Sequence, residues 1–159
     1  MNDDILLNIL NRDAKYVNSR VNLDILEGAD VTITGATGLV GLNIICALNY
    51  YNNNNAKQHI NINALSYSKP TGIIKKVFEK NCVNSISWDL SDCSFIKKLP
   101  LSDCIIHSAG YGQPGKFLDD KLKTISINTS ATISLSKKLK KEGKFLKMNI
   151  KDINFNDEK

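Results

Sequence analysis

The chain has 159 residues, of which 42% are hydrophobic and 23% are charged. These values are typical of one globular domain and exclude a disordered chain. No apolar run reaches the roughly 18 residues that a membrane-spanning helix requires, so we expect no membrane partner.

The net charge is +5, and lysines gather late in the chain, from Lys137 to Lys151. Such a run can mark a nucleic-acid surface, but it more often forms a solvated helix face. We adopt the solvated face and expect no nucleic-acid partner.

The first ten residues carry acidic side chains where a secretory signal would be basic, and they lack a small-residue cleavage site. We therefore predict a cytoplasmic protein. The four cysteines form no C-x-x-C pair and there are only two histidines, so no metal site is expected. Cys46 and Cys104 lie in apolar runs and are predicted to be buried thiols.

Hydrophobic periodicity and turn residues predict alternating strands and helices. In chain order they are a helix over 3–10, a strand over 31–34, a helix over 39–50, a polar loop over 51–58, a strand over 60–65, a helix over 72–80, a strand over 85–90, a helical turn over 94–99, a strand over 103–110, a helix over 122–142 and a strand over 144–150. Gly143 is predicted to cap the last helix.

This alternation predicts an α/β fold with a doubly wound parallel sheet of the Rossmann type, preceded by a short N-terminal helix. We divide the chain into a helical extension over 1–28, a dinucleotide-binding domain over 29–150 and a polar tail over 151–159. Ligands of such sheets bind beyond the carboxyl ends of the strands, where the strand order reverses. We therefore expect the site beside the first glycine turn and the end of the fourth strand.

Three glycines separate the first strand from the first sheet helix in "VTITGATGLVGLNII". Gly35 suits a turn that a Cβ would obstruct, Gly38 lets a ligand approach the backbone, and Gly41 lets the helix pack tightly. The free amides of a helix N-terminus attract a pyrophosphate. The spacing is G-x-x-G-x-x-G, so we predict a dinucleotide loop of that type, against the alternative of a purely structural turn.

"TGATGLVG", "WDL", "IIHSAG" and "INTSATISLSKKLK" together resemble four segments of the extended short-chain dehydrogenases/reductases, the NAD-dependent epimerases and dehydratases that modify nucleotide sugars. The resemblance covers about 29–145. It implies that Asp89 and Leu90 hold the adenine ring and that Ala109 and Gly110 border the cofactor. Asn128 occupies the Asn position of the family's helix.

The resemblance implies NAD as the cofactor. The residues expected to bind it are Gly35, Thr37, Gly38, Leu39, Val40, Ser66, Asp89, Leu90, Ala109, Gly110 and Tyr111. The turn after the second strand, "SYSK", has no carboxylate to bind the ribose hydroxyls, and Lys69 could attract a 2′-phosphate, so NADP stays open. The loop "YGQPGKF" resembles that of dehydratases and decarboxylases, in which Tyr111 and Gln113 would line the site; a plain turn is the alternative.

In the resembling family, a Tyr activated by a Lys four residues later removes the sugar hydroxyl proton. This sequence contains no Tyr-x-x-x-Lys, and we assign His107 a structural role, so no catalytic residue is assigned. We expect a relative that is truncated after about the fifth strand, frame-shifted, or a fragment of a split gene. It would lack the substrate domain and be inactive alone, which leaves open whether it is an enzyme.

The resemblance implies a nucleotide sugar as a second ligand, and uncovered surfaces would favour association or a homo-oligomer. The alternative to a cofactor-binding part of a dehydratase, epimerase or decarboxylase is a non-catalytic nucleotide-binding or protein-interaction module.

Overall fold

The structure is a computed structural model that describes residues 3–80, 83–110 and 119–147. Its strands are β1 (Asp30–Thr34), β2 (Asn61–Ser66), β3 (Asn84–Ser87), β4 (Ser102–His107) and β5 (Leu139–Lys147). Its helices are α1 (Asp3–Arg20), α2 (Leu39–Asn54), α3 (Gly72–Lys80), α5 (Lys121–Asn128) and α6 (Ser130–Ser136), with 3-10 turns η1 (Asp24–Leu26) and η2 (Cys93–Lys98).

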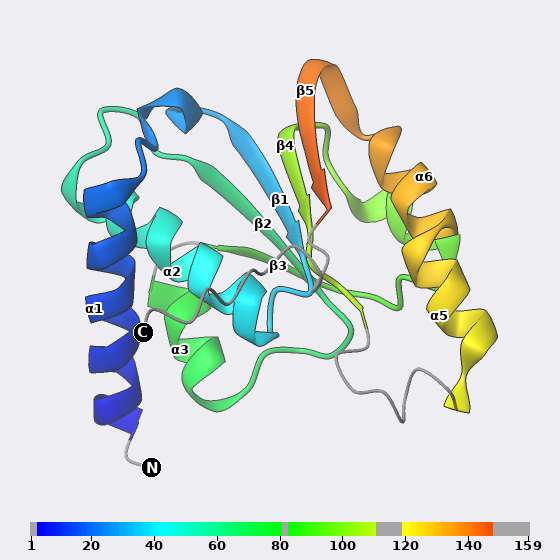
Figure 1. Ribbon diagram of the computed structural model, residues 1–159, viewed down its shortest axis with the longest axis horizontal. Coiled ribbons are helices and arrows are strands. Elements are labelled where there is room, and N and C mark those ends of the chain that lie inside the picture. Colours follow the sequence, from blue (N-terminus) through cyan, green and yellow to red (C-terminus); the bar gives the residue numbers. More distant parts are fainter. Residues whose placement is uncertain (1–2, 81–82, 111–118, 148–159) are drawn as a thin grey trace, which may run out of the picture.

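Within these residues the strands form one sheet in the order β3-β2-β1-β4-β5, and every neighbouring pair is parallel. Helices α1, α2 and α3 lie on one side of this sheet, and α5 and α6 lie on the other (Figure 1). The predicted doubly wound α/β fold is confirmed. The strand order reverses between β1 and β4, which is where ligands of such sheets bind.

Alternating side chains of the strands supply two separate cores. Ile33 and Ile62 point to the side covered by α2, where they pack in a cluster with Ile45 of that helix. Leu65 and Ile105 join the opposite cluster beneath α5 and α6. Because both faces of the sheet are covered, the central strands β1, β2 and β4 are buried on both sides, as expected for a parallel sheet.

The N-terminal helix is longer than the predicted 3–10, because its second half also packs on α2. Ala14 is buried, and the side-chain amide of Asn18 donates to the carbonyl of Ala47 at 2.9 Å. Helix α2 likewise continues to Asn54, through part of the predicted polar loop, since Tyr51 is buried and its hydroxyl donates to Asp24 at 2.7 Å. None of the helices in the described part of the chain is long and apolar enough to cross a membrane.

The prediction of one helix over 122–142 with Gly143 as its cap is wrong. The helix is interrupted at Thr129 and ends at Ser136, and Gly143 lies inside β5. A Cβ on Gly143 would lie 3.1 Å from the carbonyl oxygen of Asp103 on the neighbouring strand. Helical spacing in this lysine-rich segment was overridden by pairing with β4, where Phe145 lies opposite Ile105. The predicted strand residues 148–150 lie outside the described residues.

Several late lysines serve the fold itself. The ammonium of Lys140 lies 2.9 Å from Asp30 and 2.7 Å from Asp103, which joins β1, β4 and β5 at the amino ends of the strands. The ammonium of Lys138 donates to the carbonyl of Leu99 at 2.6 Å. These contacts favour a structural interpretation of part of the positive charge.

We expect Phe95→Ala to lower the free energy of unfolding by about 3–5 kcal/mol, because it empties a buried aromatic site. Phe95 is fully buried on η2, in the same core as Leu90 and Leu65. Urea denaturation followed by circular dichroism measures the loss, with Leu101→Ala at an exposed position as the control. A loss below about 1 kcal/mol in Phe95→Ala would contradict the packing described.

Candidate functional site

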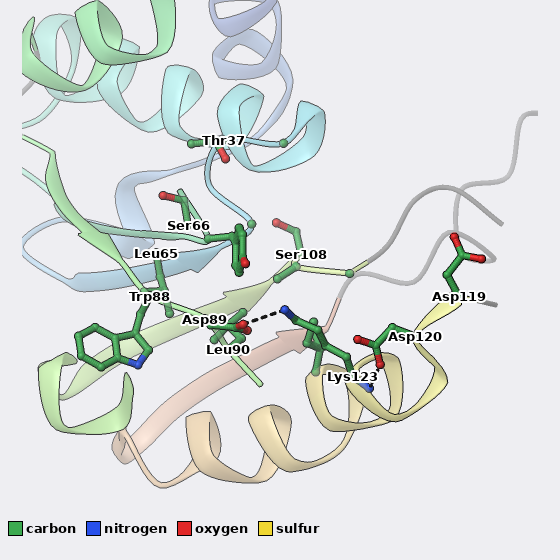
Figure 2. A pocket seen from close by; sticks show the side chains of 16 residues that line it. Thr37, Leu65, Ser66, Trp88, Asp89, Leu90, Ser108, Asp119, Asp120 and Lys123 are labelled. Carbon is green, nitrogen blue, oxygen red and sulfur yellow. Dashed lines mark hydrogen bonds and ion pairs between the residues drawn. The ribbon is translucent and has the colours of Figure 1, made fainter. Parts of the chain in front are cut away.

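A cavity of about 590 Å³ lies beyond the carboxyl ends of the strands. It receives residues from the turn after β1, from the ends of β2, β3 and β4, and from the start of α5 (Figure 2). The lining residues are Gly35, Thr37, Gly38, Leu65, Ser66, Tyr67, Trp88, Asp89, Leu90, Ser108, Ala109, Gly110, Asp119, Asp120, Lys123 and Ile127. The cavity therefore lies at the reversal of strand order, where the sequence predicted it.

The glycine turn is tight because two of its residues lack a side chain. Gly35 has a φ of 67°, and a Cβ there would lie 2.7 Å from the carbonyl oxygen of Ser108. A Cβ on Gly41 would lie 2.8 Å from the Cα of Ala36, so the helix packs directly on the turn. The amide of Ala36 also donates to the carbonyl of Leu65, which joins the turn to β2.

Gly38 differs from these two glycines because it borders open space. Its backbone is extended and needs no glycine, and within 4 Å a Cβ would meet only the carbonyl oxygen of Gly35, at 3.2 Å. Gly38 is also the N-cap of α2, whose first-turn amides have no acceptor within the helix. A diphosphate fits this position, since it can approach the bare backbone and the positive end of the helix dipole.

A chain of hydrogen bonds joins the ends of β1 and β4 beneath the cavity. Nε2 of the buried His107 lies 3.2 Å from the carbonyl oxygen of Ile127, which can only accept, so Nε2 carries the proton. Nδ1 then accepts from the hydroxyl of Thr34 at 2.6 Å, and that hydroxyl oxygen accepts the amide of Ala109 at 3.3 Å. Burial lowers the pKa of His107, and the side chain is not among those that line the cavity.

Asp89 is held in one orientation at the end of the cavity near Trp88 (Figure 2). One of its oxygens accepts the amide and the hydroxyl of Ser91 at 2.9 and 2.7 Å, and the other lies 2.8 Å from the ammonium of Lys123. Partial burial alone would raise the pKa of Asp89, but Lys123 and Ser91 outweigh it and hold that pKa below the ordinary value. The carboxylate is therefore ionised and available as an acceptor.

Most of the predicted cofactor residues come together in this cavity. Gly35, Thr37, Gly38, Ser66, Asp89, Leu90, Ala109 and Gly110 all line it. Leu39 and Val40 do not, and the side chain of Leu39 is 82% exposed, so these residues could contribute only through their amides. Tyr111 and Gln113 lie outside the described residues. Asn128 is not a lining residue; its side-chain amide donates to the carbonyl of Thr124 at 2.9 Å.

The sequence prediction missed the lining residues Trp88, Ser108 and Lys123, and it did not assign Tyr67 to the site. Ser108 and Trp88 are adjacent to assigned residues, so the strand ends themselves were the signal. Nothing local marked Lys123, which enters from the first turn of α5 and is one of many lysines in the chain.

Comparison with protein-family models matches residues 31–149 to the NAD dependent epimerase/dehydratase family. No curated protein matches the sequence. The family match begins at the second residue of β1, so α1 lies outside it.

Solved structures of similar fold include three epimerases or dehydratases. The UDP-Glc/GlcNAc 4-epimerase of Campylobacter jejuni has a TM-score of 0.53 and 22% identity, over 70% of this chain and 33% of its own. The nucleoside-diphosphate-sugar epimerase of Agrobacterium tumefaciens has a TM-score of 0.54 and 23% identity, over 75% of this chain and 34% of its own. The dTDP-glucose 4,6-dehydratase DesIV of Streptomyces venezuelae, with NAD bound, has a TM-score of 0.53 and 17% identity, over 69% of this chain and 35% of its own. The chain thus spans about a third of the length of these proteins.

We expect the free energy of unfolding to fall as the pH drops below about 6.5, the ordinary pKa of histidine. The pKa of the buried ring is lowered, so the unfolded chain binds this proton more readily than the folded chain. The free energy of unfolding should therefore fall by up to about 1.4 kcal/mol for each pH unit. Urea titrations between pH 7.5 and 5, which span the ordinary pKa of histidine, measure the slope.

His107→Gln is the matched variant, since it cannot take up the proton, and its slope between pH 6.5 and 5 should be smaller. Asp89 and Asp103, whose pKa values are lowered, change the free energy of unfolding only at lower pH, below about 4. Equal slopes in the two proteins would contradict the assignment of a neutral, buried His107.

Proposed function

The chain belongs to the NAD dependent epimerase/dehydratase family, and on that premise we propose that it binds a nicotinamide adenine dinucleotide as the cofactor-binding part of a nucleotide-sugar-modifying protein. The observation that carries the proposal is the meeting of the glycine turn, Asp89–Leu90 and Ala109–Gly110 around one cavity. These three segments are far apart in sequence, and each has a distinct part of a dinucleotide to bind.

In this proposal the pyrophosphate binds at Gly38 and the first-turn amides of α2. The adenine base binds beside Leu90, and the amino group of adenine donates a hydrogen bond to the ionised Asp89. The nicotinamide half extends toward Ala109 and Gly110. When bound, the nicotinamide supplies hydride transfer; the residues of this chain hold it and exclude water. The family resemblance favours NAD, and the turn after β2 leaves NADP as the alternative.

We assign this role to the domain over 29–150, with 1–28 as an added helical segment and 151–159 as a tail. Nucleotide sugars are proposed as the substrate class, because the similar structures include epimerases and a dehydratase of UDP- and dTDP-sugars. The reaction would be a 4,6-dehydration, epimerisation or decarboxylation. The 159 residues contain no Tyr-x-x-x-Lys, so this chain alone lacks the general base, which is worth about 10²–10⁴ in rate, and we expect binding without turnover.

A second candidate, an interaction module, is favoured by one surface. Leu122 and Ile125 of α5 and Ile133 of α6 are 81%, 60% and 59% exposed. Large apolar side chains grouped on a helix face mark protein–protein contacts more often than isolated ones do. Association through this face is compatible with cofactor binding on the other side of α5.

We expect Gly38→Val to weaken the binding of NAD⁺ and NADP⁺ at least about tenfold, since it removes a charge-assisted contact between phosphate and backbone. Isothermal titration calorimetry measures the loss. The extended backbone of Gly38 accepts valine, so circular dichroism should show a folded protein. Asn54→Val, an exposed position at the far end of the same helix, is the control. Equal heats for Gly38→Val and the unaltered chain would contradict the proposal.

We also expect the chain to self-associate at high concentration through the exposed faces of α5 and α6. Sedimentation velocity over a concentration series should show a rising sedimentation coefficient, and replacement of Ile125 and Ile133 by Lys should suppress it. Lys121→Glu changes the charge of α5 without altering the exposed apolar residues Leu122, Ile125 and Ile133, and it is the control for altered charge. A monomer at every concentration would contradict self-association through this face.

A further inference from the structure

A second cavity lies on the side of the sheet that carries α1, α2 and α3 (Figure 1). It measures about 280 Å³, near the lower limit of small-molecule sites, which suits a ligand of one ring. The lining residues that matter here are Leu7 and Leu10 of α1, Cys46, Asn49 and Tyr50 of α2, and Val77 of α3. Within the described part of the chain it shares no lining residue with the cavity beyond the strand ends, and α1 lies outside the family match.

Asn49 is the buried polar side chain of this second cavity. It is 3% exposed, and neither the oxygen nor the nitrogen of its carboxamide has a hydrogen-bond partner among the described residues. By contrast, the carboxamides of Asn52 and Asn54 on the same helix donate to backbone carbonyls at 2.9 and 2.8 Å. A buried carboxamide that makes none of its hydrogen bonds is costly, so we expect its partner to occupy the adjoining cavity.

The remaining wall of the second cavity favours an uncharged ligand. Leu10 and Val77 are buried apolar side chains. Burial raises the pKa of Cys46 to about 11, so its thiol stays neutral at pH 7. The exposed ammonium of Lys76 lies 2.7 Å from Asp3, so its charge is already paired. An ionised ligand would lose its hydration without gaining a counter-charge, whereas a neutral ring would lose little.

We propose that this second cavity binds a small, neutral ring compound through a lactam edge that pairs with the carboxamide of Asn49. A lactam edge carries an N–H donor beside a C=O acceptor. A carboxamide matches such an edge with two parallel hydrogen bonds, as Asn does with the donor and acceptor edge of adenine in DNA. The apolar side chains of α1 and α3 contact the ring. This site is separate from the proposed cofactor site and does not depend on it.

The test uses 2-pyridone, a lactam of one ring, as the probe in ¹⁵N–¹H NMR titrations of the full chain. We expect a saturable shift of the side-chain amide signals of Asn49, which are identified by their absence from the spectrum of Asn49→Leu. N-methyl-2-pyridone keeps the ring and the carbonyl but lacks the donor. It should bind at least about tenfold more weakly, the value of one hydrogen bond to a buried group. Asn49→Leu should weaken the binding of 2-pyridone at least as much.

Asn49→Leu should also raise the urea concentration at the midpoint of unfolding, since an apolar group of similar size replaces an unpaired buried amide. Its loss of binding is then not a loss of fold. Asn43→Leu, on the same helix but outside the cavity, is the control and should bind 2-pyridone as the unaltered chain does. Equal affinities for the two pyridones, or no saturable shift, would overturn the proposal. A lower midpoint in Asn49→Leu would show that ordered water already satisfies the amide and would also overturn it.

Discussion

At the centre of the sheet, the turn after β1 lies so close to the end of β4 that a side chain on Gly35 would collide with the backbone of Ser108. Hydrogen bonds through Thr34 and His107 keep the two strand ends at this distance, in a buried setting where each bond is strong and each unpaired group is costly. The helices that follow the two strands lie on opposite faces of the sheet (Figure 1), because the strand order reverses between β1 and β4. The cavity is the space that this divergence leaves.

The same constraint explains why the cavity is lined by backbone on one side and by side chains on the other. Near the glycine turn the wall is backbone together with the side chain of Thr37, and the helix dipole there favours an anion. Near β2 and β3 the chain has already left the strands, and Tyr67, Trp88 and Asp89 face the cavity from loops. Leu90 and Phe95 fix the second of these loops to the core below it, so packing on one face of the sheet holds this wall of the cavity in place.

The fold and the glycine turn were predictable because their signals are local: apolar strands, a turn with three glycines and helical spacing next to it. The end of the last helix was not predictable, since Leu139 and Phe145 fit a helix or a strand equally well until β4 is available to pair. The extra length of α1 depends on a surface of α2 that periodicity in 3–20 does not reveal. Among the residues that line the cavity, the sequence predicted those next to recognisable strand ends. It did not predict Lys123, which enters from α5.

Lys123 illustrates what such a side chain contributes to the cavity. Its sequence neighbours say nothing of Asp89, because the pair forms only when α5 covers the sheet. With Lys123 in place, the carboxylate of Asp89 is held ionised at the end of the cavity near Trp88. The charge distribution at this end of the cavity therefore depends on how α5 docks on the sheet, and not on the strand ends alone.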